Sequence, residues 1–305
     1  MPPIRILITG SNGLLGQKLI DALRNDPEVQ LIATSRGEDR TPEALGARYH
    51  SLDITDAAQV DAVFDATKPD AVIHTAAMTN VDACELDREA CQLQNVTATE
   101  HLVNAAKRHG SHFIFLSTDF IFDGANGPYK EEDAPAPLSI YGHSKLDGEH
   151  LVMNSGLAHW AIARTIIVYG IAQGLSRSNV VLWAKGALEK GQPITVVDDQ
   201  WRMPTLAEDL ADGCIRIAKR KATGIYHLCG PDGMSILELV YRVGKFFGLD
   251  ASVVSPIKSD SLGQPAKRPP RTGFLLEKAR RDLGYAPHGL EEGLAILKQQ
   301  IEASV

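Results

Sequence analysis

Short apolar runs alternate with amphipathic segments over the first two-thirds of the chain. The amphipathic segment at residues 87–110 has apolar positions at helical spacing and ends at a glycine, which favours a helix C-terminus. Strands that are apolar along their whole length are typical of a parallel sheet covered on both faces. The pattern therefore predicts an α/β fold, a Rossmann-type doubly wound parallel sheet. Its expected strands lie at residues 4–9, 29–34, 49–53, 71–76, 113–118 and 161–168.

The alternation changes after residue 170. A glycine- and serine-rich stretch, a helical pattern and a short strand pattern follow, and the segments 206–220 and 224–230 then have the pattern of one more helix and strand of the first sheet. We therefore expect two domains. The first comprises residues 1–170 and 205–231, and the second is a smaller, discontinuous C-terminal lobe of residues 171–204 and 232–305.

Composition and charge exclude several classes of protein. The 305 residues are 44% hydrophobic and 23% charged, as in ordinary globular proteins, and the longest apolar runs are too short to span a bilayer. A net charge of −7 argues against general nucleic-acid binding. The N-terminal segment has no secretory pattern. The cysteines form no CxxC pair and no metal-type cluster with histidines, so we expect a cytoplasmic protein with no metal site and with core thiols at Cys84, Cys91, Cys214 and Cys229.

A glycine-rich turn, TGSNGLLG, follows the first strand pattern and opens an amphipathic helix. Gly10, Gly13 and Gly16 let the backbone turn tightly and approach a pyrophosphate at the helix N-terminus. Glycine triplets bind dinucleotides in this strand-to-helix context, although a glycine turn without a ligand is the alternative. The turn predicts a dinucleotide site, to which we also assign Asn12 and Leu14.

Later strand ends extend this predicted site. Ser35 and Arg36 follow the second strand, where an acid would bind the ribose of NAD and an arginine suits the 2′-phosphate of NADP. An exposed loop arginine is the alternative. Asp53, with Ile54, is a candidate for the adenine amino group, although an acid at a helix N-terminus would look the same. The small residues Ala76 and Ala77 would let the cofactor lie against the backbone.

Tyr141 and Lys145 are four residues apart, so on a helix both side chains project from one face. The hydroxyl of Thr118, at the end of an upstream strand, can meet them across a cleft. Such a set can protonate a carbonyl oxygen while a cofactor supplies hydride. The same spacing recurs at Tyr241 and Lys245, but apolar residues crowd that helix and no strand-end hydroxyl precedes it. We interpret the second pair as packing and surface.

In combination, these motifs resemble the extended short-chain dehydrogenases/reductases, most closely the dTDP-4-dehydrorhamnose reductases, over nearly the whole chain. The resemblance implies an NAD(P)-binding first domain, a substrate-binding lobe, a preference for NADP(H) over NAD(H), and reduction of the 4-keto group of a 6-deoxyhexose linked to a nucleoside diphosphate. Relatives commonly form homodimers. The matching stretches are TGSNGLLGQ, TAAMTNVDACE, STDFIFDG, YGHSK, RTIIVYG and VVDDQWRMPT.

The resemblance also implies roles for the catalytic set. Tyr141 would be the general acid for the sugar C4 oxygen, and Thr118 would hydrogen-bond the reacting carbonyl. Lys145 would bind the nicotinamide ribose and lower the pKa of the tyrosine through its charge. Both Tyr141 and Lys145 are therefore also assigned to the cofactor site. Asn95 matches a position that steadies the fold near the site, with a surface amide as the alternative.

The predicted substrate residues are less uniform. The resemblance assigns Thr118, Asp119, Phe120, Asn179, Arg202 and Arg268 to the substrate. Arg202 stands where the reductases usually carry glycine, Phe120 where they carry tyrosine, and Ile167 where they carry tryptophan. An arginine that faces a diphosphate could make bidentate, charge-assisted hydrogen bonds.

Two further observations bear on function. Seven basic residues against two acids between Lys258 and Arg281 could receive an anionic substrate, or could form a solvated surface. The resemblance also extends to epimerases and other nucleotide-sugar reductases, and to NADP-binding regulatory subunits such as that of methionine adenosyltransferase. Epimerases usually carry an acid at the position of Arg36, and a regulatory subunit does not need a complete Thr/Tyr/Lys set.

Overall fold

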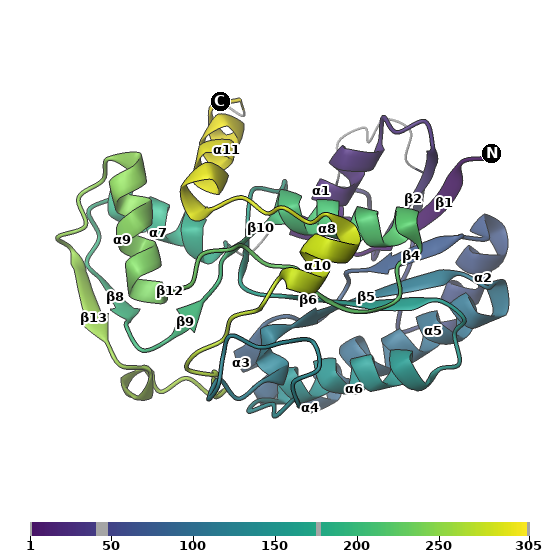
Figure 1. Cartoon of the computed structure of the whole chain (residues 1–305), viewed down its shortest axis with the longest axis horizontal. Coiled ribbons are helices and arrows are strands. Elements are labelled where there is room, and N and C mark those ends of the chain that lie inside the picture. Colours follow the sequence, from purple (N-terminus) through teal and green to yellow (C-terminus); the bar gives the residue numbers. More distant parts are fainter. Residues whose placement is uncertain (1, 41–47, 175–177, 304–305) are drawn as a thin grey trace.

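Seven parallel strands form the central sheet of the protein (Figure 1). The structure is a computed structural model that describes residues 2–40, 48–174 and 178–303. The strand order, β11-β6-β5-β4-β1-β2-β3, confirms the predicted doubly wound α/β fold. The strands are β1 (Ile4–Thr9), β2 (Val29–Ser35), β3 (Arg48–Ser51), β4 (Ala71–His74), β5 (His112–Thr118), β6 (Trp160–Thr165) and β11 (Gly224–His227).

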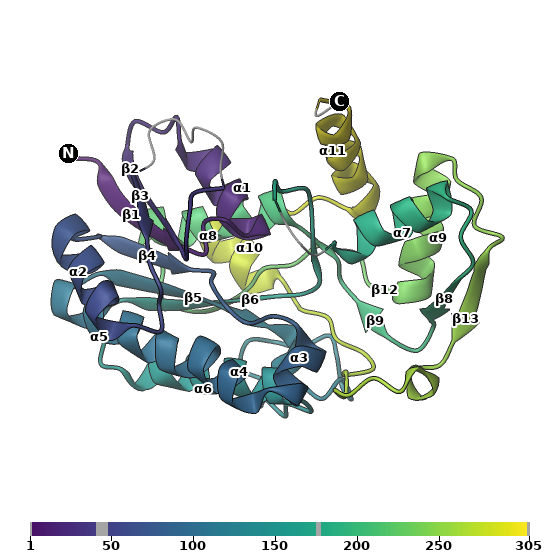
Figure 2. The same ribbon diagram turned by 180° about the vertical axis from the view of Figure 1, so that it is seen from behind.

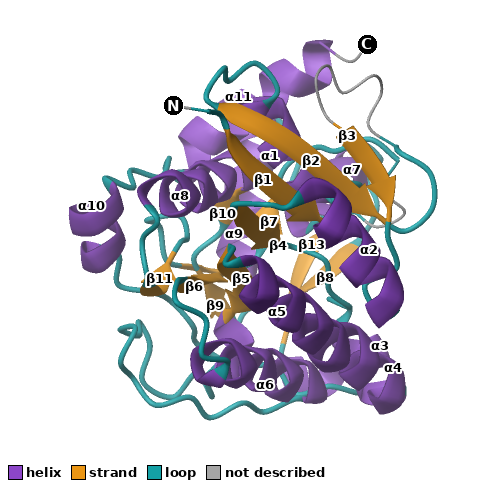
Figure 3. Cartoon of the chain, turned by 90° about the vertical axis from the view of Figure 1, so that its right-hand side faces the viewer, coloured by secondary structure: helices purple, strands orange, loops and turns teal. Residues whose placement is uncertain are grey.

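Helices cover both faces of this sheet (Figure 3). One apolar core joins the sheet to α1 (Leu14–Leu23) and α8 (Ala207–Arg220), and a second joins it to α2 (Ala57–Thr67), α5 (Ala98–His109) and α6 (Ile140–Asn154). Every residue of β4 and β5 is buried, because neither face of these strands meets solvent. Burial on two faces is the reason why the strands appear as uninterrupted apolar runs.

The helical pattern at residues 87–110 is interrupted by a π-helical turn. Residues 88–92 form α4 (Arg88–Gln92), and η1 (Leu93–Thr97) widens the helix before α5 begins. A π-turn accommodates one extra residue in a helix and is often found near functional sites. Asn95 lies in this turn with only 1% of its surface exposed.

The expected strand at residues 161–168 is also shorter than predicted. β6 ends at Thr165, and Ile167 has φ +32°, which is an unusual backbone conformation for a β-branched residue. The chain turns there, so that β7 (Val168–Tyr169) leaves the sheet and pairs with β10 (Thr205–Leu206). The side-chain pattern could not reveal this turn, because both flanking segments are apolar.

A third apolar core lies in a lobe beside the sheet, which contains three helices (Figures 1 and 2). In this lobe β8 pairs with β13 in parallel and β9 with β12 in antiparallel fashion. Its elements are α7 (Val180–Glu189), β8 (Ile194–Val197), β9 (Trp201–Arg202), β12 (Met234–Ser235), α9 (Ile236–Phe247), β13 (Val254–Ile257) and α11 (Leu290–Ala303).

The expected domain boundaries stay a prediction, and one helix departs from them. The helix α10 (Glu277–Leu283) falls in the range expected for the lobe, yet it packs against α8 and β11 of the sheet. Its Ala279 and Leu283 belong to the same apolar core as α1 and α8. Among the described residues, no helix is both long and apolar enough to cross a membrane.

Candidate active site

The glycine-rich turn between β1 and α1 has a geometry that requires glycine. Gly10 has φ +71°, and a Cβ atom there would lie 2.9 Å from the backbone nitrogen of Ala76. A Cβ at Gly16 would collide with the Gly10 carbonyl oxygen and lie 2.6 Å from the Ser11 Cα. Close packing of the helix against the turn therefore excludes any side chain at these positions.

The same turn presents unsatisfied polar groups at the start of α1. Gly13 is the N-cap and supplies no side-chain hydrogen bond, so the first N–H groups of the helix remain open. The Ser11 hydroxyl is fully buried and has no hydrogen-bond partner among the described residues. Open N–H groups and an orphaned hydroxyl at a helix N-terminus fit the phosphates of a dinucleotide. Ser11 was not among the predicted residues, because its only signal in the sequence was its place inside the turn.

Three other residues predicted to bind the cofactor make contacts within the protein. Asn12 accepts from the Arg40 N–H at 2.9 Å and donates to the Glu38 carbonyl oxygen at 2.9 Å, so its amide holds the loop after β2. Leu14 is only partly buried, near Gly170. Ile54 lies in the core beneath α2. These three residues support the shape of the turn and its neighbours.

The ends of β2 and β3 place Ser35, Arg36 and Asp53 near one another. Hydrogen bonds from the Thr55 side chain and backbone, at 2.7 and 3.0 Å, hold the pKa of Asp53 below its usual range, and the Arg36 charge lowers it further. Arg36 itself is exposed. At the end of β4, Ala76 is half-buried like its neighbour Ala77 and donates its N–H to the Thr9 hydroxyl at 3.3 Å.

Tyr141 and Thr118 lie near each other at the carboxyl ends of the strands. Tyr141 lies in the first turn of α6, which Ser139 caps by accepting from the Gly142 N–H at 3.2 Å. Burial raises the pKa of Tyr141, and a hydrogen bond with Thr118 is the largest opposing effect. Gly142 lets the helix touch the preceding loop, because a Cβ there would collide with the Phe120 carbonyl oxygen. The structure thus places two of the three predicted catalytic side chains, Tyr141 and Thr118, close to each other.

Lys145 lies one turn farther along α6 and is 4% exposed. Its Nζ lies 4.0 Å from the centroid of the Phe115 ring. Burial lowers the pKa of Lys145 to about 7, while the charge of Glu149 and the thiol of Cys91 oppose this shift. His74 at the end of β4 is fully buried, and burial together with the Lys145 charge lowers its pKa to about 3. The lysine is therefore the titratable cation of this group near neutral pH.

The lowered pKa of Lys145 predicts a dependence of stability on pH. Between pH 7 and 9 the unfolded chain still holds the proton on this lysine, whereas the folded protein releases it. Since the unfolded state binds more protons, stability rises with pH in this window. Compared with Lys145→Met, the wild type is expected to gain about 2 kcal/mol in free energy of unfolding from pH 7 to 9. Urea unfolding of both proteins at both pH values measures this difference.

An exposed lysine provides the control for that measurement. Lys267→Met should follow the wild type at both pH values, because Lys267 is solvent-exposed. If the wild type and Lys145→Met kept the same stability difference at pH 7 and 9, Lys145 would retain its proton throughout, contrary to the burial argument.

Asn95 connects two segments of the site. Its Nδ2 donates to the Met78 carbonyl oxygen at 3.1 Å and to the Ser144 hydroxyl at 3.0 Å, and its Oδ1 accepts from the Met78 N–H at 2.7 Å. Ser144 in turn donates to the Tyr141 carbonyl oxygen at 2.8 Å. This arrangement ties the loop after β4 to the helix of Tyr141, in agreement with the expected steadying role of Asn95.

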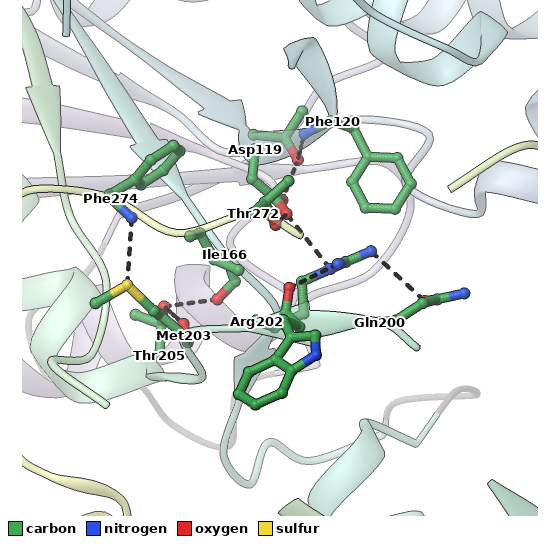
Figure 4. Close-up of polar contacts among 11 residues, drawn as sticks. Asp119, Phe120, Ile166, Gln200, Arg202, Met203, Thr205, Thr272 and Phe274 are labelled. Atoms are coloured by element: carbon green, nitrogen blue, oxygen red, sulfur yellow. Dashed lines mark hydrogen bonds and ion pairs between the residues drawn. The ribbon is translucent and has the colours of Figure 1, made fainter. Parts of the chain in front are cut away.

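A second polar cluster, beside Thr118, joins the sheet edge to the lobe (Figure 4). Asp119 is 2% exposed and accepts hydrogen bonds from the hydroxyls of Thr118, at 3.1 Å, and Thr272. Burial raises the pKa of Asp119, and the charge of Arg202 opposes this shift most strongly. The Phe120 ring lies edge-on to Tyr141 at 5.8 Å between centroids, and the Arg202 Cζ lies 5.7 Å from the Phe120 centroid. The Phe120 ring is thus a neighbour of both Arg202 and Tyr141.

The guanidinium of Arg202 has few close partners although it is 3% exposed. Among the described residues, only its Nη1 makes a short hydrogen bond, to the Trp201 carbonyl oxygen at 2.7 Å. Nη2 lies 3.5 Å from the Gln200 Oε1, and Nε lies 3.6 Å from the Asp119 Oδ2. Burial lowers the pKa of Arg202, as does the charge of Arg268. A buried cation with unfilled donors beside the site is suited to an anionic ligand.

Other positions assigned to the substrate already have partners within the protein. Asn179 caps α7 by accepting from the Leu182 N–H at 3.1 Å, and it donates to the Gly170 carbonyl oxygen at 2.7 Å. Both ends of its amide are thus engaged, and a contact of Asn179 with substrate stays a prediction that these bonds do not support. Arg268 pairs with Asp82.

Several residues of the basic segment, Lys258 to Arg281, already have partners within the protein. Lys258 pairs with Asp198 at 2.8 Å, and Arg281 pairs with Asp282 at 2.7 Å. The Arg271 Cζ lies 5.0 Å from the centroid of the Trp201 ring.

The second tyrosine–lysine pair lies on α9 of the lobe, where Tyr241 is 41% exposed.

Comparison with known proteins places this site in a family. A sequence model of the RmlD substrate binding domain matches residues 4–302. The chain belongs to this family. This match confirms the resemblance seen in the motifs. The roles of the individual site residues of this chain stay predictions.

Relatives within and around the RmlD family differ in what they do. Methionine adenosyltransferase 2 subunit beta of Xenopus laevis is 33% identical over 271 residues, 86% of this chain and 78% of that protein. The "Probable low-salt glycan biosynthesis reductase Agl14" of Haloferax volcanii is 31% identical over 294 residues, 95% and 96% of the two chains. A dTDP-4-dehydrorhamnose reductase from Bacillus anthracis, solved in complex with NADP, superposes with a TM-score of 0.83 at 28% identity, covering 98% and 99%.

Proposed function

We propose that the protein is an NADPH-dependent reductase of the 4-keto group of a 6-deoxyhexose linked to a nucleoside diphosphate. The observation that supports this most is the proximity of Tyr141 to Thr118 beside the buried Lys145. These residues come from β5 and α6, at the same sheet edge as the glycine turn. A hydroxyl pair and a cation next to a dinucleotide site suit carbonyl reduction.

The proposed cofactor is NADP(H), as in the related Bacillus anthracis structure. The glycine turn, with the open Ser11 hydroxyl, would hold the pyrophosphate. Ser35 and Arg36 would bind the 2′-phosphate, and the half-buried Ala76 and Ala77 would line the cofactor path. NADPH supplies a hydride to the carbonyl carbon when it is bound.

The chain's own residues would carry the proton chemistry. Tyr141 would donate its phenolic proton to the sugar C4 oxygen, and Thr118 would hydrogen-bond the same oxygen and polarise the carbonyl. Protonated Lys145 would hold the ribose hydroxyls and stabilise the phenolate that forms on Tyr141. Phe120 packs edge-on against the Tyr141 ring.

The proposed anchor for the substrate diphosphate is Arg202. Its guanidinium is buried with long contacts to Gln200 and Asp119, so a phosphate group could take the open donors. Charge-assisted bonds of this kind are roughly twice as strong as bonds between neutral groups. Because Arg202 lies one ring from Tyr141, bound phosphates would place the sugar close to the acid.

The proposed role of Arg36 predicts cofactor preference. Arg36→Gln is expected to weaken NADPH binding by roughly 10- to 100-fold, because a hydrogen bond to a charged group contributes about 1.5–3 kcal/mol. NADH binding should be unchanged. Fluorescence titration with both nucleotides measures this, with the surface variant Arg24→Gln as the control. Equal affinity of the wild type for NADPH and NADH would contradict the role of Arg36.

A second candidate function is an NADP-binding regulatory subunit. Its support is the 33% identity with methionine adenosyltransferase 2 subunit beta over most of the chain. A regulatory role does not require Tyr141 to lie near Thr118, nor a buried Lys145. The complete set therefore favours the reductase.

One assay separates the two candidates. NADPH oxidation is followed with a panel of nucleotide-linked 4-keto sugars, and a reductase should turn over at least one of them. Epimerase activity would appear as interconversion of sugars with tightly bound NAD in the purified protein. If NADP(H) binds but no sugar supports turnover, the regulatory function replaces the reductase.

A further inference from the structure

We propose that Asp82 is a positioning residue that fixes Arg268 at the rim of the active site, where Arg268 faces the anionic part of the ligand together with Arg202. This inference rests on the proposed binding of a nucleoside diphosphate. It concerns the strap, residues 258–276, which runs from β13 past α3 (Val81–Leu86) to α10 (Figures 1 and 2).

The Asp82 carboxylate bonds to the strap at two places, the Arg268 side chain and the Ala266 backbone. Its Oδ2 accepts from the Arg268 Nη2 at 2.7 Å, and its Oδ1 accepts from the Arg268 Nη1 at 3.1 Å. The same Oδ1 accepts from the Ala266 N–H at 3.3 Å, and Arg268 Nη1 donates to the Ala266 carbonyl oxygen at 3.1 Å. A bidentate pair with a backbone bond on each side fixes the plane of the guanidinium.

This ion pair lies at the rim of the candidate site. Val81, the neighbour of Asp82, packs in the apolar cluster that contains Tyr141 and Phe120. The charge of Arg268 lowers the pKa of Arg202, so the two guanidinium groups lie within electrostatic range. Like charges are kept near one another here because Asp82 compensates one of them. The ion pair with Asp82 thus holds the Arg268 guanidinium near that of Arg202.

The strap is anchored at its two ends, and from Pro270 to Leu275 its backbone bonds to Trp201 and Tyr129. At the lobe end Ser259 bonds to Asp199 and Gln200, and at the sheet end Thr272 bonds to Asp119. Residues 260–265 between them are exposed. Releasing Arg268 from Asp82 would therefore let the middle of the strap move and would return rotamer freedom to a long side chain. A ligand would then have to order Arg268 again when it binds.

Two measurements on Asp82→Asn test the proposal. Calorimetry with UDP and dTDP should show affinity lowered about tenfold, while NADP affinity stays within twofold. Trypsin should cleave after the exposed Lys267 several times faster than in the wild type, because the strap is loosened. When a sugar that the wild type reduces is used as substrate, Asp82→Asn should show a higher KM, while its kcat changes less than twofold. Glu89→Gln, which removes an exposed acid on α4, is the matched control and should behave as wild type.

A variant with the two charges exchanged separates two roles of the ion pair: presenting Arg268 to the ligand, and only holding the strap in place. In Asp82→Arg/Arg268→Asp the ion pair is restored in reverse, so protection from trypsin should return, whereas nucleotide affinity should stay low because the cation has left the strap. Recovery of affinity in this variant would overturn the proposal, as would unchanged or tighter nucleotide binding in Asp82→Asn. If no nucleoside diphosphate binds the wild type, the proposed substrate class fails instead, and the trypsin result still reports on the ion pair.

Discussion

Tyr141→Phe is expected to lower kcat about 100- to 10,000-fold, the usual contribution of a positioned general acid. The substitution removes only the hydroxyl, so the ring can keep its edge-on contact with Phe120. Cofactor affinity should change little, because the glycine turn and Arg36 are untouched. Steady-state NADPH oxidation with a substrate found in the panel, together with NADPH titration, measures both quantities.

Tyr241→Phe is the matched control for this substitution. It removes the same hydroxyl from the other tyrosine–lysine pair, on α9, where the side chain is 41% exposed. Its kcat should equal that of the wild type. A Tyr141→Phe enzyme that turned over like the wild type would show that another group supplies the proton.

Arg164→Met is expected to lower the free energy of unfolding by about 3–5 kcal/mol, because it leaves an uncompensated buried charge. Arg164 on β6 and Glu149 on α6 are 2% and 0% exposed, and they form a bidentate pair with N–O distances of 2.9 and 2.7 Å. Arg164 also donates to the Glu131 carbonyl oxygen at 3.0 Å. Equilibrium unfolding in urea measures the loss.

Two controls accompany this variant. The double variant Arg164→Met/Glu149→Leu should recover much of the stability, since it removes both charges and leaves an apolar contact. Arg24→Gln disrupts an exposed pair with Asp21 and should cost less than about 1 kcal/mol. A loss below 1 kcal/mol in Arg164→Met would mean that Glu149 is neutral or hydrated in the folded protein.

The buried pair also bears on the site. Glu149 lies one helical turn from Lys145 on α6, and its charge raises the pKa of that lysine against the effect of burial. Arg164 therefore anchors to the sheet the same helix that carries Tyr141 and Lys145. Because Arg164→Met/Glu149→Leu removes the Glu149 charge, the pKa of Lys145 should be lower in this double variant than in the wild type, even if stability is recovered.

Local patterns determined the framework of this protein. The apolar runs of β1, β4 and β5 and the amphipathic helices between them predicted the doubly wound sheet, because full burial on two faces leaves a continuous apolar signal in the sequence. The glycine turn was equally readable, since positive φ and close packing admit only glycine. Motif context also separated Tyr141 from Tyr241, and the two lie in a buried and an exposed environment.

Departures from local regularity needed the folded chain. The π-turn that carries Asn95 and the turn at Ile167 lie inside segments whose side-chain pattern continues unbroken. In both places, hydrogen bonds to other parts of the chain compensate for the irregular backbone. Asn95 bonds to Met78, and the Ile167 carbonyl oxygen accepts from the Thr205 N–H.

Only the tertiary structure decided which polar residues act together. The sequence marked Asn179, Arg202 and Arg268 alike as substrate residues, yet Asn179 caps a helix, Arg268 pairs with Asp82, and Arg202 remains buried with unfilled donors. Arg268 and Asp82 are 186 positions apart, and Thr272 and Asp119 are 153 apart. Charge and residue type are local properties of a sequence, but the partner that a charge finds depends on chain segments that meet only after the sheet and the lobe have folded.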